Sequence, residues 1–176
     1  MSYYEIIYEY AADNYGLITS AQAKELGIPS VELVKLSHRD RLQRIWHGVY
    51  RISHYIPTPL DKYAEAVAIV GEGAYIYGES VLAMHGLALL NPTILYVATS
   101  RRVRKKLPKY IKKINIKKIS NVVYYEGIPS QDIVSAVIVC REQIMTDRLI
   151  NAVDDAEKQG LILQEERKNL KELLSI

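Results

Sequence analysis

The chain has 176 residues, of which 49% are hydrophobic and 24% charged, a composition typical of one medium or two small folded domains and not of a disordered chain. Its formal net charge of +3 hides an asymmetry, because ten basic and no acidic residues lie between Arg101 and Lys118, which leaves 13 basic and 20 acidic residues elsewhere. The single cysteine, Cys140, excludes an intramolecular disulfide and a cysteine-based zinc site. The start is acidic and tyrosine-rich and no apolar run approaches about 18 residues, so we expect a soluble cytoplasmic protein without a signal peptide, a membrane span, a metal or a cofactor.

Apolar residues at helical spacing near the N-terminus predict three helices, over 3–14, 21–26 and 31–39. Thr19 or Ser20 can cap the second helix, and Gly27 ends it because glycine readily adopts the left-handed conformation of a helix end. The third helix turns Leu33 and Leu36 inward. Two short helices joined by a glycine turn are typical of a helix-turn-helix.

The segment from Leu42 to Ile52 is predicted to form a β-hairpin. β-branched and aromatic residues lie on both sides of His47 and Gly48, where glycine can supply the positive φ of a tight turn. Three helices followed by such a hairpin form a winged helix-turn-helix, in which the third helix enters the major groove of DNA and the hairpin contacts the neighbouring backbone. We expect this domain to occupy residues 1–53.

The third helix and the hairpin carry the predicted DNA contacts. Side chains near the start of the helix are expected to contact bases, and the basic residues beyond them to neutralise phosphates. The predicted contacts are Ser30, Glu32, Lys35, His38, Arg39, Arg41, Arg44, His47 and Arg51. A solvated or protein-docking surface is the alternative for this helix face. For Trp46, packing against the helices is favoured over stacking on DNA.

Two prolines, Pro57 and Pro59, predict a linker over 54–59, because proline interrupts helices and sheet ladders alike. A second domain is expected over 60–176. Helical patterns cover 60–70, 80–87, 133–140, 143–159 and 164–174, and β-branched and aromatic runs predict strands at 93–99 and 122–126. The predicted fold class is therefore α/β of the α+β type, with an N-terminal winged helix-turn-helix followed by a small mixed α/β domain.

The basic run, residues 101–118, lies between the two predicted strands of this second domain. Apolar residues recur from Val103 to Ile119 and are expected to anchor the run while its cations face water. The predicted sequence-independent phosphate contacts are Arg101, Arg102, Arg104, Lys105, Lys106 and Lys109. A protein with six to ten such contacts loses roughly 10³ to 10⁵ in affinity between 50 and 200 mM salt. A solubilising surface and a binding surface for an acidic protein are the alternatives.

The sequence predicts no catalytic site and hence no enzyme. His85 lacks a serine-base-acid order, a second histidine at metal spacing and a glycine-rich phosphate loop, and it is expected to cap carbonyls at a helix end near Gly86. Glu166, Arg167 and Lys168 have the order of a nuclease motif, but they lie in a charged helical segment instead of a strand.

Several segments occur in an order that is seen in one protein family. They are GLITSAQAKELGI, LSHRDRL and RIWHGVYRI in the first domain and YIYGESVLAMHGL and GIPSQDIVSAV in the second. In this order and spacing the chain resembles the AbiEi-type antitoxins of bacterial type IV toxin-antitoxin systems, which are also transcriptional repressors. Asp40 stands where that family commonly has glycine, in the turn after the third helix.

The resemblance implies a winged helix that represses its own operon and a C-terminal domain that neutralises a toxin in abortive infection against phage. In this family the toxin is nucleotidyltransferase-like and is countered without a stable complex. The expected partners are therefore double-stranded operator DNA and such a toxin. The alternative from another class is a winged-helix protein-interaction module whose basic C-terminal domain binds an acidic protein.

Overall fold

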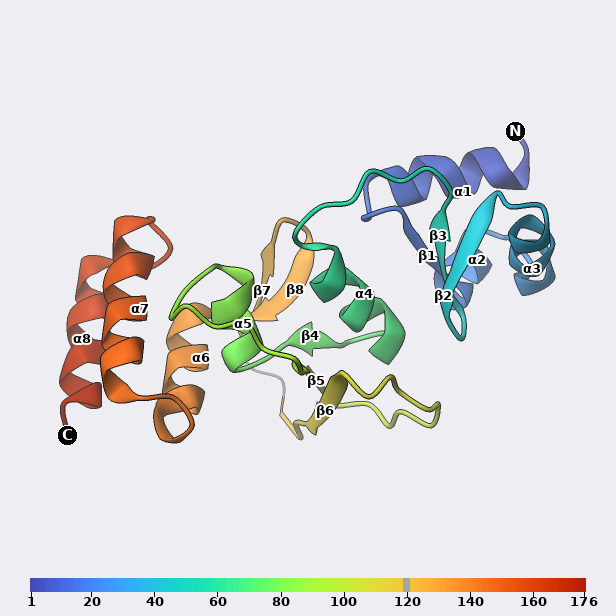
Figure 1. Ribbon diagram of the computed structural model, residues 1–176. Coiled ribbons are helices and arrows are strands. Elements are labelled where there is room, and N and C mark those ends of the chain that lie inside the picture. The colour runs from blue at the N-terminus through green and yellow to red at the C-terminus, as the bar shows by residue number, and fades with distance from the viewer. Residues whose placement is uncertain (119–120) are drawn as a thin grey trace. The chain divides into compact units, whose positions relative to one another are not determined.

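The computed structural model describes residues 1–118 and 121–176, which divide into two compact units, Met1–Gly71 and Glu72–Ile176 (Figure 1). Each unit combines helices with a sheet. The predicted fold class is confirmed, since a helix-turn-helix-type domain at the N-terminus is followed by an α/β domain. In the part of the chain that the structure describes, no helix is both long enough and apolar enough to cross a membrane.

The first unit begins with helices that alternate with short strands. It comprises α1 (Tyr3–Ala12), β1 (Leu17–Thr19), α2 (Ser20–Glu25), α3 (Ser30–His38), β2 (Leu42–Trp46), β3 (Val49–Ile52) and α4 (Asp61–Val70). Its strands form an antiparallel sheet in the order β1-β3-β2. The helices predicted from the sequence and the hairpin β2–β3 are confirmed, with helix ends that shift by one or two residues.

Capping side chains and a glycine turn set the ends of the first helices. Ser2 and Thr19 precede α1 and α2, and their hydroxyls accept hydrogen bonds from the backbone N–H groups of Glu5 and Gln22. The side chains of Glu5 and Gln22 accept bonds from the backbone N–H groups of the cap residues in return, which forms a capping box at each helix. Gly27, at a φ of +78°, then reverses the chain after α2 so that α3 can begin.

The sequence does not predict β1. Its three residues are too few to show a period of two, and they run directly into the cap of α2. They become a strand because they pair with β3, with Ile18 opposite Tyr50. The pairing places β3 at the centre of the sheet, with a neighbour on each side.

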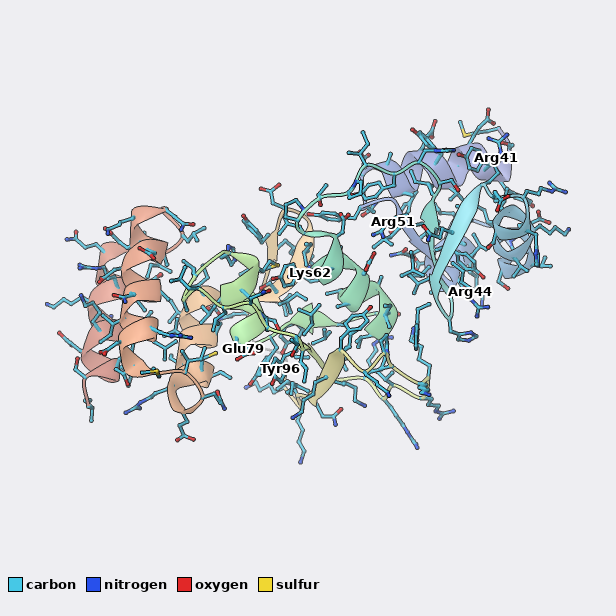
Figure 2. The ribbon with its side chains drawn as sticks, in the orientation of Figure 1. Arg41, Arg44, Arg51, Lys62, Glu79 and Tyr96 are labelled. Carbon is cyan, nitrogen blue, oxygen red and sulfur yellow. The ribbon has the colours of Figure 1, made fainter. Side chains whose placement is uncertain are left out.

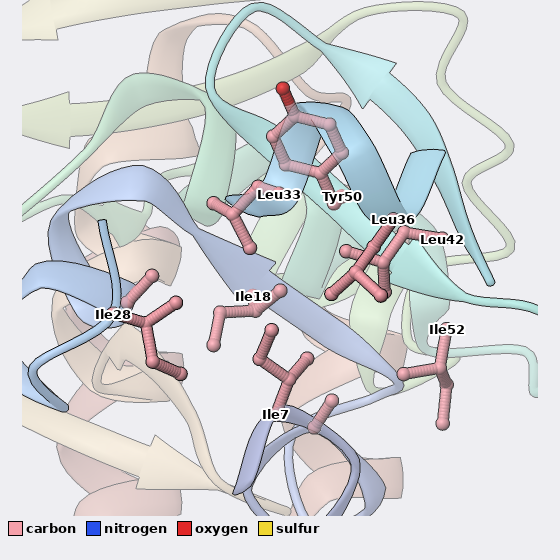
Figure 3. Packing of buried hydrophobic residues seen from close by; sticks show 10 residues of the cluster. Ile7, Ile18, Ile28, Leu33, Leu36, Leu42, Tyr50 and Ile52 are labelled. Carbon is pink, nitrogen blue, oxygen red and sulfur yellow. The ribbon is translucent and has the colours of Figure 1, made fainter. Parts of the chain in front are cut away.

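Side chains from every helix and strand of residues 3–52 form the core beneath α3 (Figure 3). The buried residues are Ile7, Ala11, Ile18, Ala23, Ile28, Leu33, Leu36, Leu42, Tyr50 and Ile52. Full burial of one Leu or Ile side chain contributes about 1.5 to 3 kcal/mol. Burial of Leu33 and Leu36, which the sequence predicts, therefore fixes the rotation of α3 about its own axis and decides which of its residues face outward.

The first unit extends beyond the predicted linker. The Tyr55 hydroxyl and the Thr58 backbone N–H donate hydrogen bonds to the two carboxylate oxygens of Asp61, each at 2.9 Å. Arg51 in β3 forms an ion pair with Glu65 in α4. These contacts join α4 to β3, so the first compact unit ends at Gly71, whereas the sequence starts the second domain at residue 60.

The second unit is built on a five-stranded mixed sheet in the order β6-β5-β4-β8-β7. Its elements are β4 (Tyr75–Ile76), α5 (Glu79–Met84), β5 (Leu95–Thr99), β6 (Ile111–Asn115), β7 (Val122–Tyr125), β8 (Ile128–Gln131), α6 (Ile133–Val139), the 3-10 helix η1 (Cys140–Glu142), α7 (Thr146–Lys158) and α8 (Gln164–Leu174). The pairs β4–β5 and β7–β8 are antiparallel, and β4–β8 and β5–β6 are parallel.

The sequence predicts β5 and β7 but not the other three strands of this sheet. β4 has two residues, β6 lies among lysines of the basic run, and β8 contains Pro129, and each feature weakens the sequence signal of a strand. Pairing defines them instead, as where Ile111 of β6 lies opposite Leu95 of β5. Ile119, one of the apolar residues expected to anchor the basic run, lies outside the described residues.

Candidate nucleic-acid interface

The outer face of α3 is a solvent-exposed surface of the first unit. Successive residues of an α-helix are rotated by about 100°, so the face opposite the buried Leu33 and Leu36 is made by four exposed residues. These residues, named here the outer face of α3, are Val31, Val34, Lys35 and His38. The outer face therefore combines two β-branched apolar side chains with a lysine cation and an imidazole.

The structure brings the predicted helix contacts to two different places. Lys35 and His38 lie on the outer face, whereas Ser30 and Arg39 are exposed at its borders, at the first turn and at the C-terminal end. Glu32 lies on the flank, where its carboxylate accepts a bond from Lys35 Nζ at 3.2 Å. Val31 and Val34 are not among the predicted contacts, which are all polar residues, although the inward positions of the leucines already imply that these valines face outward.

Asp40 forms the turn after α3 in a backbone conformation that glycine adopts readily. Asp40 has a φ of +58°, in the left-handed region that Asp tolerates better than most residues. Its backbone carbonyl accepts a bond from Ser53 Oγ at 2.6 Å. Arg41 follows, exposed, with its guanidinium carbon 5.0 Å from the centre of the Tyr4 ring (Figure 2).

The hairpin β2–β3 is short and its tip is basic. Gly48 takes the predicted positive φ, +73°, and its carbonyl accepts a bond from the Ser20 N–H at the start of α2. Arg44 is exposed, and its Nη2 lies 3.1 Å from Nδ1 of His47, which is exposed too. Trp46 is half-buried, as expected for a side chain that packs against the domain.

Arg51 does not lie on this surface, contrary to the sequence prediction. Its side chain is only 12% exposed and forms an ion pair with Glu65. Its Nε donates to the backbone carbonyl of Tyr15 at 3.2 Å, and its guanidinium lies 5.0 Å from the centre of the Tyr55 ring (Figure 2). Side chains alternate along a strand, so while Tyr50 is buried in the core Arg51 points to the opposite face, where Glu65 and Tyr55 meet it.

The second unit carries the other predicted cations in the basic loop, residues 101–109, which connects β5 to β6. Arg102, Arg104, Lys106 and Lys109 are exposed. Arg101 pairs with Glu72 at 3.0 Å, but the two side chains are 61% and 73% exposed, so water weakens the pair. Lys105 is half-buried, and this burial lowers the pKa of its amine.

The apolar residues of the basic run lie inward, as the sequence predicts for those that the structure describes. Val103 and Leu107 are half-buried, and Ile111 is buried in the sheet. Nζ of Lys112, in β6, lies 5.9 Å from the centre of the ring of Tyr96 in β5. The run is thus a folded surface of cations held by a sheet and not a free tail.

His85 is the C-cap residue of α5, the place that the sequence predicts, but its side-chain Nδ1 caps no carbonyl within residues 1–118 and 121–176. Its ring packs on Tyr125 with 4.1 Å between ring centres. Its Nδ1 is buried and has no hydrogen-bond partner among the residues that the structure describes. Burial lowers the pKa of this imidazole, so the neutral form of the ring is favoured.

The remaining polar residues with a possible catalytic interpretation have structural contacts. Ser80 is fully buried and its Oγ accepts a bond from the backbone N–H of Tyr96 at 2.8 Å, which ties α5 to β5. Glu166 accepts a bond from the backbone N–H of Leu163 at the start of α8. Over residues 1–118 and 121–176, no three His, Cys, Asp or Glu side chains gather in a way that could hold a metal ion.

Comparison with known protein families gives a match over part of the first unit. Residues 5–53 match the model of a family described as "Transcriptional regulator, AbiEi antitoxin", which confirms the family resemblance expected from the sequence. The matched segment contains α3 with its outer face and the hairpin β2–β3. No curated protein matches the chain.

Proposed function

We propose that this chain, whose residues 5–53 match the AbiEi antitoxin regulators, is a DNA-binding transcriptional repressor of its own operon and a type IV antitoxin against a nucleotidyltransferase-like toxin. The observation that carries the proposal is the outer face of α3 within the segment that matches a regulator family. The face stands clear of the core, and Lys35, Arg39 and Arg44 are exposed on it or next to it.

The proposed mechanism is occlusion of a promoter by a winged helix. The outer face of α3 enters the major groove, and exposed cations beside it neutralise phosphates on either side of the groove. These cations are Arg39 at the end of α3, Arg41 after it and Arg44 in the hairpin. Arg51 takes no part in this contact, because its guanidinium is held by Glu65.

The basic loop of the second unit is proposed to add phosphate contacts without reading sequence. Its exposed cations, Arg102, Arg104, Lys106 and Lys109, would each release a counterion from DNA, which makes affinity depend steeply on salt. Removal of these four charges is expected to weaken binding to every duplex and to lower the slope of log affinity against log salt.

The test of the repressor role is the affinity of the full chain for DNA that lies upstream of its own coding sequence. Fluorescence anisotropy at fixed salt should show that Lys35→Ala with Arg39→Ala weakens specific binding at least tenfold, because a polar contact from Lys35 to a base contributes about 1 to 3 kcal/mol and Arg39 neutralises a phosphate. Lys158→Ala with Lys168→Ala is the matched control, since it removes two exposed charges from α7 and α8. Equal affinities of the two double variants would contradict the assignment of α3.

The antitoxin role needs a separate test in cells. Expression of an adjacently encoded nucleotidyltransferase-like protein by itself should arrest cell growth, and co-expression of the full chain in the cytoplasm should restore growth. The variant Lys35→Ala with Arg39→Ala should lose repression of a promoter reporter but still restore growth, because its second unit is unchanged. Failure of the wild-type chain to restore growth would contradict this half of the proposal and leave the repressor role intact.

A second candidate function is a protein-interaction module whose basic second unit binds an acidic protein. One observation favours it, the ten cations without an acid between Arg101 and Lys118. Weak DNA binding that does not respond to salt, together with a stable co-purifying partner, would support this candidate over the repressor.

A further inference from the structure

We infer that Val31 and Val34 determine specificity by contacting the C5-methyl groups of thymines in the major groove, an inference that rests on the proposed DNA-binding function. Both side chains are on the outer face of α3, and they are 53% and 43% exposed. The two exposed valines form a small apolar patch on a helix face that otherwise carries a cation and an imidazole, and a ligand that removes this patch from water gains free energy.

The charges around the two valines select DNA as that ligand. Lys35 and His38 share their face, and Arg39 and Arg44 are exposed nearby along the chain. The acid on this part of the helix, Glu32, is paired with Lys35. A major groove offers both chemistries at once, because the thymine methyl is an apolar group that lies between two rows of phosphates.

The two valines are held rigidly in place. A β-branched side chain has one strongly preferred rotamer in a helix, so little side-chain entropy is lost when it meets a base. The burial of Leu33 and Leu36 fixes the rotation of α3 beneath them. The valines occupy the second and fifth positions of α3, which starts at Ser30, within the N-terminal part of the helix that reads base edges in helix-turn-helix proteins.

The spacing predicts which bases are read. Residues three apart on a helix have Cβ atoms about 5 to 6 Å apart, and the rise between base pairs is about 3.4 Å. One helix can therefore place Val31 and Val34 on methyl groups that are one or two base steps apart. The recognised site should contain two thymines, on either strand, at that separation.

The experiment removes one methyl group at a time from DNA. The full chain first selects its site from a pool of random duplexes, and each thymine of that site is then replaced singly by deoxyuridine, which lacks only the C5-methyl. We expect roughly a fourfold loss of affinity at two positions, the effect of one buried methyl group. Val31→Ala should remove the sensitivity at one of these positions and Val34→Ala at the other.

The control is Ile138→Ala, which truncates an exposed apolar residue of α6 in the second unit and should leave the deoxyuridine profile of the wild type unchanged. Alanine favours helix at least as well as valine, so loss of folding is not expected for either valine variant, and circular dichroism verifies this. Two results would overturn this inference but leave the proposed function intact. One is site-specific binding whose affinity does not change with deoxyuridine at any position. The other is a loss of affinity on deoxyuridine substitution that persists in both valine variants. Absence of any selected site would overturn the proposed function as well.

Discussion

The side chain of Arg51 is expected to stabilise the first unit and not to bind DNA, and a substitution separates the two roles. Arg51→Met retains an unbranched apolar stem beside Tyr55 but removes the charge that pairs with Glu65. It also removes the donor to the backbone carbonyl of Tyr15. Glu65 is then left as a carboxylate that is only 20% exposed and has lost this ion-pair partner.

The expected loss of unfolding free energy lies between the values for an exposed ion pair and for a fully buried ion pair. Removal of one partner from a fully buried pair costs about 3 to 5 kcal/mol, whereas an exposed pair contributes about 0.2 to 1 kcal/mol. With side chains that are 12% and 20% exposed, we expect Arg51→Met to lower the free energy of unfolding by about 2 to 3 kcal/mol. Arg51→Met with Glu65→Met should recover most of this loss, because no unpaired charge remains.

Urea denaturation followed by tryptophan fluorescence measures this effect in the right part of the chain. Trp46 is the only tryptophan of the sequence and lies in β2, so its emission reports the first unit. Affinity for DNA, measured where the variant is fully folded, should keep the salt slope of the wild type. Two results would refute the reasoning and restore Arg51 as a phosphate contact. One is a free energy of unfolding of Arg51→Met within about 0.5 kcal/mol of the wild type. The other is a slope of log affinity against log salt that is smaller in the variant by about 0.9.

Three further predictions concern the turn after α3, the ion pair on its flank and the buried histidine of the second unit. Asp40→Gly should raise the free energy of unfolding by about 0.5 to 1 kcal/mol, because Asp40 has a φ of +58° and glycine, without a Cβ, adopts this conformation without steric strain. A midpoint of urea denaturation at a lower urea concentration than that of the wild type would contradict this. Glu32→Gln frees Lys35 from its ion pair and removes a negative charge from α3. Affinity for any duplex, measured by anisotropy titration, should therefore rise roughly two- to fivefold, which corresponds to the free energy of an exposed ion pair. An unchanged or lower affinity would count against α3 as the DNA-facing helix. Burial lowers the pKa of His85 below its ordinary 6.5, so the second unit should have its full stability above pH 6.5 and lose stability as the pH falls from 6.5 towards the pKa of the folded state. Thermal melting followed by circular dichroism should show this loss in the wild type and a smaller loss in His85→Gln. An identical pH dependence of the melting temperature in both proteins would exclude the histidine as its source.

The sequence by itself determines the local structure of the N-terminal segment. Thr19, one of the two cap candidates for α2, forms the cap together with Gln22, and Gly27 and Gly48 make the predicted turns. Each of these features depends on residues within a few positions of one another, so it can be read from a short window. The motifs that lie within residues 5–53 are local in the same way, and this segment matches the model of the AbiEi antitoxin regulators.

Tertiary structure alone decides which charges are available to a ligand. Arg44 and Arg51 are both arginines of the hairpin, but Arg44 is exposed while Arg51 is held by Glu65, fourteen residues further along the chain. Nothing in a basic residue's own neighbourhood shows which carboxylate will meet it after folding.

The same physical reason separates the strands and the site residues that the sequence predicts from those it misses. β1 and β6 are strands because they pair with β3 and β5, and the pairing depends on contacts that a short window does not contain. Val31 and Val34 are apolar like the core residues beside them, and only the packing of Leu33 and Leu36 beneath α3 turns them towards solvent. The sequence thus determines that α3 exists and, to within one residue, where it begins and ends, and the packed core decides which of its faces is exposed to solvent.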